Sequence, residues 1–377
     1  MNAPLTMTEN MQEHKFDVRS LSSADVAPKR LSPQQYKELG EELDQLRQQI
    51  ADDLGQSDVD YINQVIRVSR GCEVVGRLLL HVSLDPVTWS LGVASLSAAK
   101  ILENMEIGHN VMHGQYDWTN DKALSSRHYD WDNVCDKESW RNHHNFEHHT
   151  YTNIIGKDRD YGYAVLRLSD DEPWRPRHLL QPAAFVGLTL LFEWGVALHE
   201  IESEKLISGE ISIREKIPFL KRFAKKASRQ VIKDYVFFPM LAGPMAGKVA
   251  LGNLAANGIR NIWTGSVIFC GHFTEGAETF TEEECENETK GQWYFRQILG
   301  SSNFEGPRWL HILSGHLSHQ MEHHLFPDIP AHRYTEMQTE VKRICEKFSI
   351  PYNTGSFKEQ YKTVLQRVWK YTLPTAA

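Results

Sequence analysis

Two kinds of segment alternate along this chain. One kind is apolar with polar interruptions, and the other is strongly polar. The interruptions are single charged residues, such as Arg77 and Glu193, or Gly, Pro and Asn. No window offers the roughly 18 uninterrupted apolar residues of a simple membrane-spanning helix, so such segments suit a bilayer only where neighbouring helices bury their polar atoms. The apolar segments are 74–84, 86–113, 179–198, 235–252 and 254–273.

The polar segments predict further helices and a tail. Residues 1–30 show no pattern and predict a mobile tail. Ser32 and Pro33 are typical of an N-cap and a first helical position, and they predict an amphipathic helix over 33–50. Residues 114–177 are charged, aromatic and turn-rich, whereas 202–233 contain nine lysines and arginines and the end of the chain favours helix to residue 370. The sequence therefore predicts an all-α protein.

Composition excludes some functions and leaves the membrane question open. The net charge of −8 argues against a general nucleic-acid binder. A charged fraction of 24% and a mean hydropathy of −0.46 are those of an ordinary soluble protein, so a membrane protein of this sequence must keep much of its mass outside the bilayer. The five cysteines form no CxxC pair, which argues against disulfides and iron–sulfur clusters.

The placement of the histidines is the feature of the sequence that indicates a reactive site. Eleven of the eighteen histidines fall in four short stretches, and pairs spaced four apart share one face of a helix. On a single helix, His316, His319, Gln320 and His323 would form one polar stripe. The four stretches hold His109 and His113; His143, His144, His148 and His149; His272; and His316, His319, His323 and His324.

The number of histidines indicates two metal ions. Imidazole is the commonest metal ligand and suits iron, zinc, copper and nickel. A zinc site uses about four ligands, three of them from protein when it is catalytic, so eight to ten histidines predict two ions. A nitrogen-rich pair of sites without thiolates favours iron and dioxygen chemistry over hydrolysis.

Longer motifs connect these histidines to a known family. GHNVMHGQYDW, HNFEHHTYTNIIGKDRDYGY, NIWTGSVIFCGHF and SGHLSHQMEHHLFPDIPAHRY resemble the integral-membrane fatty acid desaturases, and most of all the bacterial acyl-CoA Δ9 desaturases. The resemblance runs from about residue 59 to residue 371. Two positions depart from it, because His319 stands where relatives usually have an aromatic residue and His143 is an additional histidine.

The resemblance implies a set of metal ligands. Histidines of the three boxes would bind a di-iron centre, with two further histidines and a glutamine completing it, and neighbouring side chains would support the ligands. The implied ligands are His109, His113, His144, His148, His149, His272, His316, Gln320, His323 and His324. The implied supporting residues are His143, His319, Asp158, Asp160 and Glu322.

The resemblance also implies a reaction and its partners. Two irons, Fe2+ when reduced, would use O2 to introduce a cis double bond at Δ9 of an acyl-CoA, with reduction of O2 to water. Because the chain has neither a cytochrome b5-like HPGG segment nor a GxGxxG turn, electrons must come from an external ferredoxin or flavin/iron–sulfur reductase. Candidate contacts to CoA are Arg127, Arg141, Lys157, Arg159 and Arg177.

By the same analogy, residues 31–377 form one desaturase domain with about four membrane crossings. The membrane helices are expected within about 74–113 and 179–273, and a cytosolic cap within 114–178 and 274–370, at the bacterial inner membrane. The basic segment 202–233 favours an arrangement in which 179–198 lies in the interface and 235–252 and 254–273 form a returning pair. That basic segment would then meet the cytosolic leaflet and its anionic lipids.

Alternatives stay open at this level. A di-iron lipid or alkane hydroxylase could use the same ligands, and a non-catalytic membrane zinc-binding protein would also need histidines. Glu106 and His109 match the ExxH motif of soluble di-iron carboxylate bundles, but that fold requires two such motifs and two further glutamates. The sequence therefore favours a desaturase.

Overall fold

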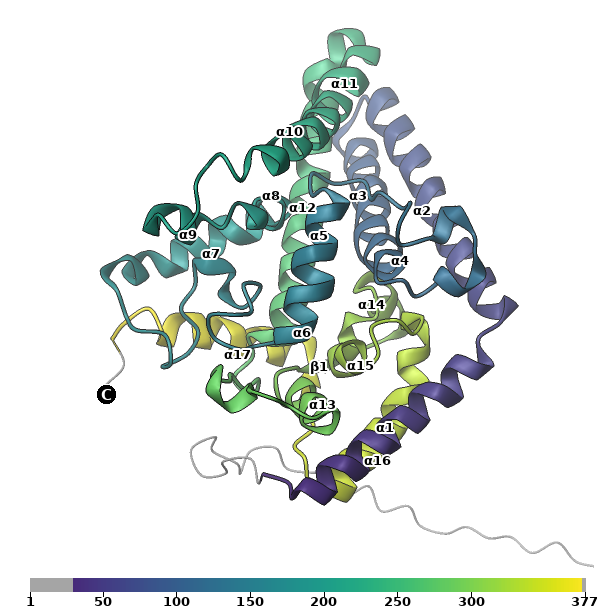
Figure 1. Cartoon of the computed structure of the whole chain (residues 1–377). Helices are drawn as coiled ribbons and strands as arrows, with labels where there is room; N and C mark the ends of the chain where they lie inside the picture. Colours follow the sequence, from purple (N-terminus) through teal and green to yellow (C-terminus); the bar gives the residue numbers. More distant parts are fainter. Residues whose placement is uncertain (1–29, 375–377) are drawn as a thin grey trace, which may run out of the picture.

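The computed structural model describes residues 30–374, which form a predominantly helical molecule (Figure 1). Helix α1 (Pro33–Asp53) begins as the sequence predicts, because Ser32 and Gln35 exchange hydrogen bonds between side chain and backbone N–H, and Pro33 fills the first position. The helix is three residues longer than expected. Apart from Arg30, the tail predicted for residues 1–30 lies outside the described residues.

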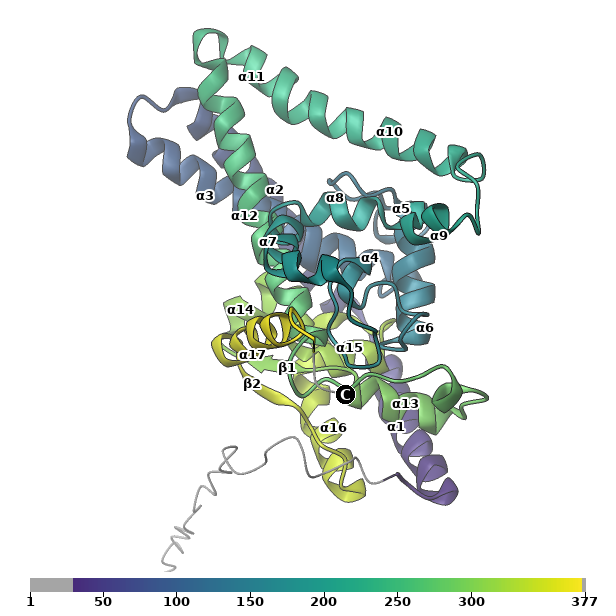
Figure 2. The same cartoon turned by 90° about the vertical axis from the view of Figure 1, so that its left-hand side faces the viewer.

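Three long helices and one short one form a group that projects from the rest of the molecule (Figure 2). Gly76 allows the first two to meet closely, since a Cβ there would lie 2.6 Å from the backbone of Leu96. Two charged residues of this group pair with Asp234 of the π-helix Lys233–Phe237, which accepts hydrogen bonds from Arg77 at 3.0 Å and from Lys100 at 2.8 Å. The helices are α2 (Gln56–Val82), α3 (Pro86–Leu102), α11 (Phe238–Leu241) and α12 (Ala246–His272).

The predicted boundary between the two later apolar segments is wrong. Residues 252–254 lie in the middle of α12, and the chain turns instead at a short 3-10 helix, Gly243–Met245. Gly252 and Asn253 serve packing rather than a turn. A Cβ at Gly252 would clash with Leu80, and Asn253 donates to the backbone oxygen of Asp234.

The predicted apolar segment 179–198 is two helices, α7 (Gln181–Leu190) and α8 (Phe192–Ala197). At the break between them, the amide of Asn261 in α12 donates a hydrogen bond to the carbonyl of Leu190 at 2.9 Å. Within residues 30–374, no single helix has both the length and the hydropathy of a membrane span. Only the bent pair Pro176–Leu190 and Phe192–Ile201, whose halves meet at 90°, meets those criteria.

Two histidine stretches lie in π-helices rather than ordinary α-helices. Helix α3 continues into the π-helix Glu103–His109 and then α4 (Asn110–Met112), while α5 (Lys137–Trp140) continues into the π-helix Arg141–His148 and then α6 (His149–Tyr151). The i→i+5 hydrogen bonding of a π-helix widens the turn and is frequent at functional sites. The helical spacing assumed from the sequence holds only approximately here.

The third histidine stretch is not one helix, so the predicted stripe of His316, His319, Gln320 and His323 is wrong. Gly315 and His316 adopt left-handed conformations, with φ of 68° and 54°. They separate α14 (Arg308–Leu313) from the 3-10 helix Leu317–His319 and from α15 (Gln320–Leu325). A Cβ at Gly315 would lie 2.7 Å from the carbonyl oxygen of Met105, so this turn packs directly against the first π-helix.

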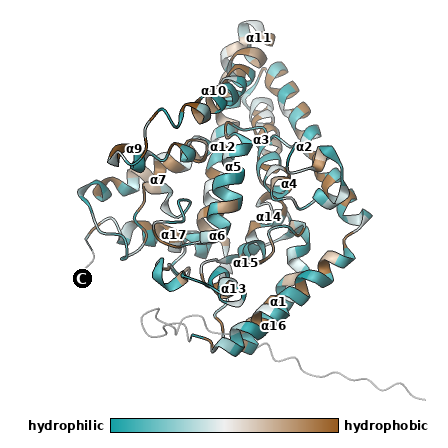
Figure 3. Cartoon of the chain, in the orientation of Figure 1, coloured by the Kyte–Doolittle hydropathy of each residue, from teal (hydrophilic) through white to brown (hydrophobic). Residues whose placement is uncertain are grey.

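The end of the molecule opposite the projecting helices is built around α1. Helix α1 packs on α13 (Lys290–Leu299) and α16 (Tyr334–Phe348) around a hydrophobic core, and hydrophilic positions alternate with hydrophobic ones along α1 (Figure 3). The only sheet in residues 30–374 is a parallel pair, β1 (Asn303–Glu305) and β2 (Thr354–Ser356), so the all-α prediction is confirmed in substance. The other helices are α9 (Ser203–Ser208), α10 (Ile217–Ile232) and α17 (Phe357–Lys370), the π-helix Lys233–Phe237, and 3-10 turns at Asp117–Thr119, Lys122–Leu124, Gly162–Ala164, Pro176–Leu180, His199–Ile201, Glu283–Cys285 and Ala331–Arg333.

Candidate metal centre

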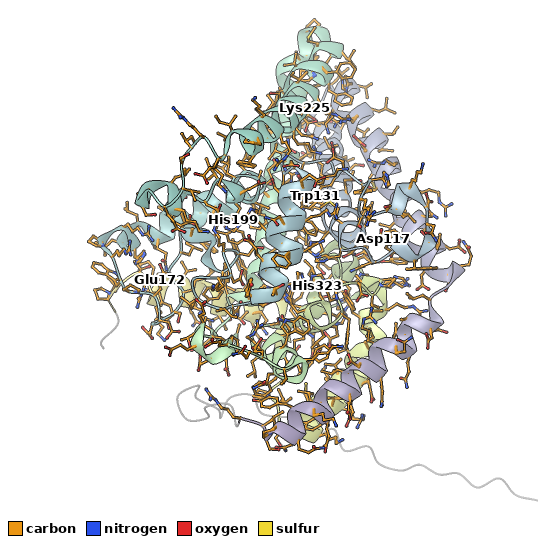
Figure 4. The ribbon with its side chains drawn as sticks, viewed as in Figure 1. Asp117, Trp131, Glu172, His199, Lys225 and His323 are labelled. Atoms are coloured by element: carbon orange, nitrogen blue, oxygen red, sulfur yellow. The ribbon has the colours of Figure 1, made fainter. Side chains whose placement is uncertain are left out.

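Histidines from four distant parts of the chain converge in one buried space, which we call the histidine chamber. Their ligand atoms fall into two groups, and within each group all of these atoms lie within 4.8 Å of one another. In Figure 4, His323 lies near the centre of the molecule, where these elements meet. The first group is His109, His113, His144 and His323, and the second is His148, His272 and His324.

His149 lies between the two groups. Its ring centroid is 4.6 Å from that of His113 and 4.9 Å from that of His323, both in the first group. It also stacks on His324 of the second group, with centroids 4.4 Å apart and planes 16° apart. The histidine chamber thus comprises these eight residues.

The Nδ1 atoms of most chamber histidines are held by neighbouring oxygen atoms. Asp160 lies 2.9 Å from Nδ1 of His144, and Asp158 lies 2.9 Å from Nδ1 of His148. An imidazole whose Nδ1 is fixed by a carboxylate or carbonyl presents Nε2 to a metal with a defined ring orientation. The other Nδ1 contacts are His272 to the Gly300 carbonyl at 3.2 Å, His324 to Gln297 at 3.0 Å and His323 to the Tyr334 hydroxyl at 3.4 Å.

The Nε2 atoms lack ordinary partners, which fits bound metal. Those of His113, His144 and His149 are buried without a hydrogen-bond partner in residues 30–374. Elsewhere two Nε2 atoms face each other, at 3.4 Å between His109 and His323 and 3.0 Å between His272 and His324. Buried polar atoms normally find partners, so this donor set, all nitrogen and without thiolates, fits two metal ions.

Burial also sets the protonation of these ligands. Loss of hydration lowers the pKa of His149, His323 and His324 well below the ordinary value, so these imidazoles are neutral and free to bind metal. His148 differs. Burial acts to lower its pKa, but the charge and the hydrogen bond of Asp158, together with the charge of Asp160, outweigh burial and raise it.

The two predicted supporting aspartates contact the histidine chamber, whereas the other predicted supporting residues do not hold its ligands. The Nδ1 of His143 lies 2.8 Å from Glu147. His319 stacks on His311, with centroids 4.9 Å apart, and its Nε2 lies 3.2 Å from Thr335. Glu322 accepts hydrogen bonds from Asn303 and Tyr352 rather than from a histidine.

Two predicted ligands lie at or beyond the edge of the histidine chamber. The amide nitrogen of Gln320 lies 3.0 Å from Nε2 of His272, and its buried oxygen has no partner among the described residues. His316 falls in neither metal-binding group, since its Nδ1 lies 3.0 Å from Glu106 in the first π-helix. Gln320 can therefore complete the second group, whereas His316 belongs to neither group.

Sequence inspection missed several contributors. His199 lies outside the four histidine stretches, yet its Nδ1 lies 2.9 Å from the same Asp160 that holds His144. Trp140 stacks on His144 with centroids 4.7 Å apart, and Gln297 and Tyr334 hold other ligands. Tyr334 ends the last of the quoted motifs, whereas no motif marks His199, Trp140 or Gln297.

A pocket adjoins the histidine chamber. It extends from His109 and His144 along α8 and α12 to the buried ion pair of Glu193 and Arg260. Figure 4 shows Trp131 and His199, two of its lining residues, on different sides of the central helix. Its large apolar and aromatic lining residues are Met105, Trp131, Trp140, Tyr163, Phe192, Val196 and Ile268.

The basic residues predicted to contact CoA do not line this pocket. Lys157 and Arg159 form ion pairs with Glu282 and Glu204, each at 2.8 Å, and Arg177 lies 3.9 Å from Glu172. Arg127 and Arg141 have no ionic partner among residues 30–374. The structure therefore leaves these two guanidinium groups free to bind an anion.

Comparison with known proteins places this architecture in context. Residues 87–356 match the fatty acid desaturase family. The chain is 44% identical over 348 residues to the NADPH-dependent stearoyl-CoA 9-desaturase of Mycobacterium tuberculosis strain H37Rv, covering 91% of this chain and 82% of that protein. It is also 26% identical over 269 residues to the sn-1 linoleoyl-lipid 6-desaturase of a Synechocystis strain, covering 70% of this chain and 74% of that protein.

Proposed function

This chain belongs to the fatty acid desaturase family, and on that basis we propose that it introduces a cis double bond at Δ9 of a saturated fatty acyl-CoA with consumption of O2. The observation that carries the proposal is the histidine chamber, in which unpartnered Nε2 atoms converge beside an aromatic pocket. Removal of hydrogen from unactivated carbons is beyond any side-chain acid or base. The histidines must therefore hold the reactive group.

We assign two iron ions to the histidine chamber. His109, His113, His144 and His323 would hold one, and His148, His272 and His324 the other, with His149 between them. When bound, such a pair supplies the O2-derived oxidizing power that desaturation requires. Asp158 and Asp160 fix the imidazoles of His148 and His144, so the protein determines where that chemistry happens.

The pocket residues position the substrate. Trp131, Trp140 and Phe192 offer aromatic surface to an alkyl chain, and their burial excludes water from the reacting carbons. Holding two adjacent carbons at a fixed place beside the histidine chamber converts an improbable encounter into an oriented one. Because the thioester end stays outside, the depth of the pocket selects the carbon position.

Residues 31–377 would form one desaturase domain that is embedded in the bacterial cytoplasmic membrane from the cytosolic side. Support comes from large apolar side chains that are exposed on the projecting helices, including Val74, Leu78, Leu91 and Leu254. Contiguous exposed apolar surface of this kind marks contact with lipid or protein. The spans would lie within 74–113 and 179–273, and the caps within 114–178 and 274–370.

The substrate's CoA moiety and the electron donor would bind on the cytosolic caps. Arg127 and Arg141, which have no ionic partner among the described residues, are the favoured contacts to CoA phosphates; Lys157, Arg159 and Arg177 would first have to leave their carboxylates. An external ferredoxin or a flavin/iron–sulfur reductase would supply electrons. The name of the mycobacterial relative includes NADPH dependence, which supports a reductase chain.

Product analysis tests the proposal directly. Purified protein, an NADPH-driven reductase system and stearoyl-CoA should yield the cis-Δ9 acid by mass spectrometry, together with about two irons per chain. A hydroxy acid in place of the alkene would identify a hydroxylase. About one zinc and no iron would identify a non-catalytic zinc-binding protein.

A further inference from the structure

Helix α10 carries two rows of cations, and every cation of the first row pairs with a carboxylate of the protein. This inner row consists of Arg222, Lys226 and Lys233, the last of which immediately follows α10. Arg222 donates to Asp136 at 3.1 Å and to Glu200 at 3.0 Å, while Lys226 and Lys233 pair with Asp130 and Asp132. The inner row therefore attaches α10 to the loop that precedes the second histidine stretch.

The outer row consists of Lys221, Lys225 and Arg229. These residues are four apart, so they share one face of the helix and span about 12 Å along it. All three are exposed, and none has an acidic partner among residues 30–374. Lys225 is labelled in Figure 4 on the upper part of the molecule. Like charges four apart on a helix repel one another, so the outer row is electrostatically unfavourable without an external anion.

Exposed apolar residues flank the outer row on both sides. Ile217 is 43% exposed at the start of α10, Ile232 is 55% exposed at its end, and Phe237 beyond it is 53% exposed. Figure 2 shows α10 extending from α11 away from the projecting helices and passing above α8 and α9. An exposed helix face that is cationic in the middle and apolar at both ends suits a membrane interface.

We propose that the outer row binds the phosphate groups of anionic phospholipids at the cytosolic leaflet. This inference rests on the membrane placement in the proposed function. The surface is a convex helix face without a cavity, and its cations are spread in a line, which matches neighbouring headgroups in a plane better than one compact ligand. Each cation near an anionic lipid surface adds affinity that salt weakens. The binding would hold α10, and through the inner row the loop 130–136, against the bilayer.

Lipid titration of the full-length chain tests this proposal. The protein, purified in a neutral detergent, is titrated with phosphatidylglycerol or with phosphatidylcholine, and binding is measured by native mass spectrometry and by the shift in Tm. Phosphatidylglycerol should bind at least roughly tenfold better than phosphatidylcholine at low salt, and the preference should shrink as salt rises. The triple variant Lys221→Gln, Lys225→Gln, Arg229→Gln should lose that preference.

Two control variants make the result decisive. The charge-conserving variant Lys221→Arg, Lys225→Arg, Arg229→Lys should bind phosphatidylglycerol like the wild type, which separates charge from folding. A matched variant that removes exposed cations elsewhere, Lys37→Gln, Arg67→Gln, Lys122→Gln, should also keep the preference. Unchanged phosphatidylglycerol binding by the outer-row variant overturns the proposal, as does a loss of CoA binding by that variant without a loss of lipid binding.

Activity in the same preparations separates this proposal from the proposed function. Lys221, Lys225 and Arg229 do not line the pocket or the histidine chamber, so the outer-row variant should keep wild-type desaturation at saturating substrate. Absence of desaturation by the wild type would contradict the proposed function but leave the lipid measurement intact.

Discussion

The histidine chamber and a second histidine cluster show what distinguishes a metal centre from a mere concentration of histidine. We call the second cluster the outer histidine group, which consists of His311, His316, His319 and His332. In the chamber, oxygen atoms hold the Nδ1 atoms of five histidines, and the ligand atoms converge in two groups. In the outer histidine group the rings stack, with His311 and His319 4.9 Å apart and His332 4.2 Å from Tyr61, and no set of ligand atoms converges.

Both groups draw on one short stretch of sequence. The left-handed turn at Gly315 and His316 directs His316 toward Glu106, whereas α15 directs His323 and His324 into the histidine chamber. Backbone direction, rather than the number of nearby histidines, therefore decides which imidazoles can bind metal. Anchoring of Nδ1 alone does not, because Glu106 holds the Nδ1 of His316 just as Asp158 holds that of His148. The predictions below test this distinction.

The largest effect is expected from removing a chamber ligand. His113→Ala should abolish desaturation and reduce bound iron to about one ion per chain or less, because His113 supplies an unpartnered Nε2 to the first group. Iron is measured by elemental analysis of the purified variant. Retention of two irons and activity would show that the chamber does not work as its geometry indicates.

The next effect concerns the carboxylates that orient ligands. Asp160→Asn should weaken metal binding or activity about 10- to 100-fold, because Asp160 holds His144 and His199 through their Nδ1 atoms. Chelator competition measures the affinity. Glu322→Gln is the matched control. Glu322 is fully buried within the third histidine stretch but accepts hydrogen bonds from Asn303 and Tyr352, so its loss should leave iron affinity unchanged while lowering Tm.

The third effect is a pH dependence of stability that should distinguish the outer histidine group from the histidine chamber. Burial, despite nearby Asp58, lowers the pKa of His332 to about 4. The unfolded chain gains a proton at His332 as pH falls below about 6.5, whereas the folded chain does not until about pH 4, so acid destabilises the fold over that window. Between pH 7.5 and pH 5, the free energy of unfolding of His332→Gln should therefore fall less than that of the wild type, by on the order of 1 kcal/mol.

Thermal melts at both pH values measure the His332 effect. Because His332 belongs to the outer histidine group, the difference between variant and wild type should be the same in iron-loaded and chelator-treated protein. A difference that appears only after chelation would place His332 in contact with the metal centre and remove the distinction between the groups.

The sequence predicts the ligands better than their surroundings, for reasons visible in particular residues. Short-range spacing is sufficient for His109 and His113 or for His144 and His148, because residues four apart lie on one face of a helix. It fails at His316, because the left-handed turn at Gly315 and His316 interrupts the helix. It also fails for His199 and Gln297, because only tertiary packing brings them to Asp160 and His324.

In the fold as well, some features follow from local sequence and others depend on tertiary contacts. The capped start of α1 follows from Ser32, Pro33 and Gln35, which interact locally. The break between α7 and α8 and the continuity of α12 through Gly252 depend instead on contacts with distant residues, Asn261 with Leu190 and Gly252 with Leu80. Apolar periodicity identifies such helices but does not determine where they end.

The smallest effect is expected at the histidine that departs from the family. His319→Phe should keep two irons and near wild-type activity, since His319 contacts His311 and Thr335 and lies outside both metal groups. The free energy of unfolding should change by no more than about 1 kcal/mol. Phenylalanine keeps the stacking on His311 and removes the Nδ1 atom that is buried without a partner among the described residues, and this gain offsets the lost contact with Thr335. A loss of iron in this variant, measured beside His113→Ala, would show that stacked imidazoles of the outer histidine group also support the metal centre.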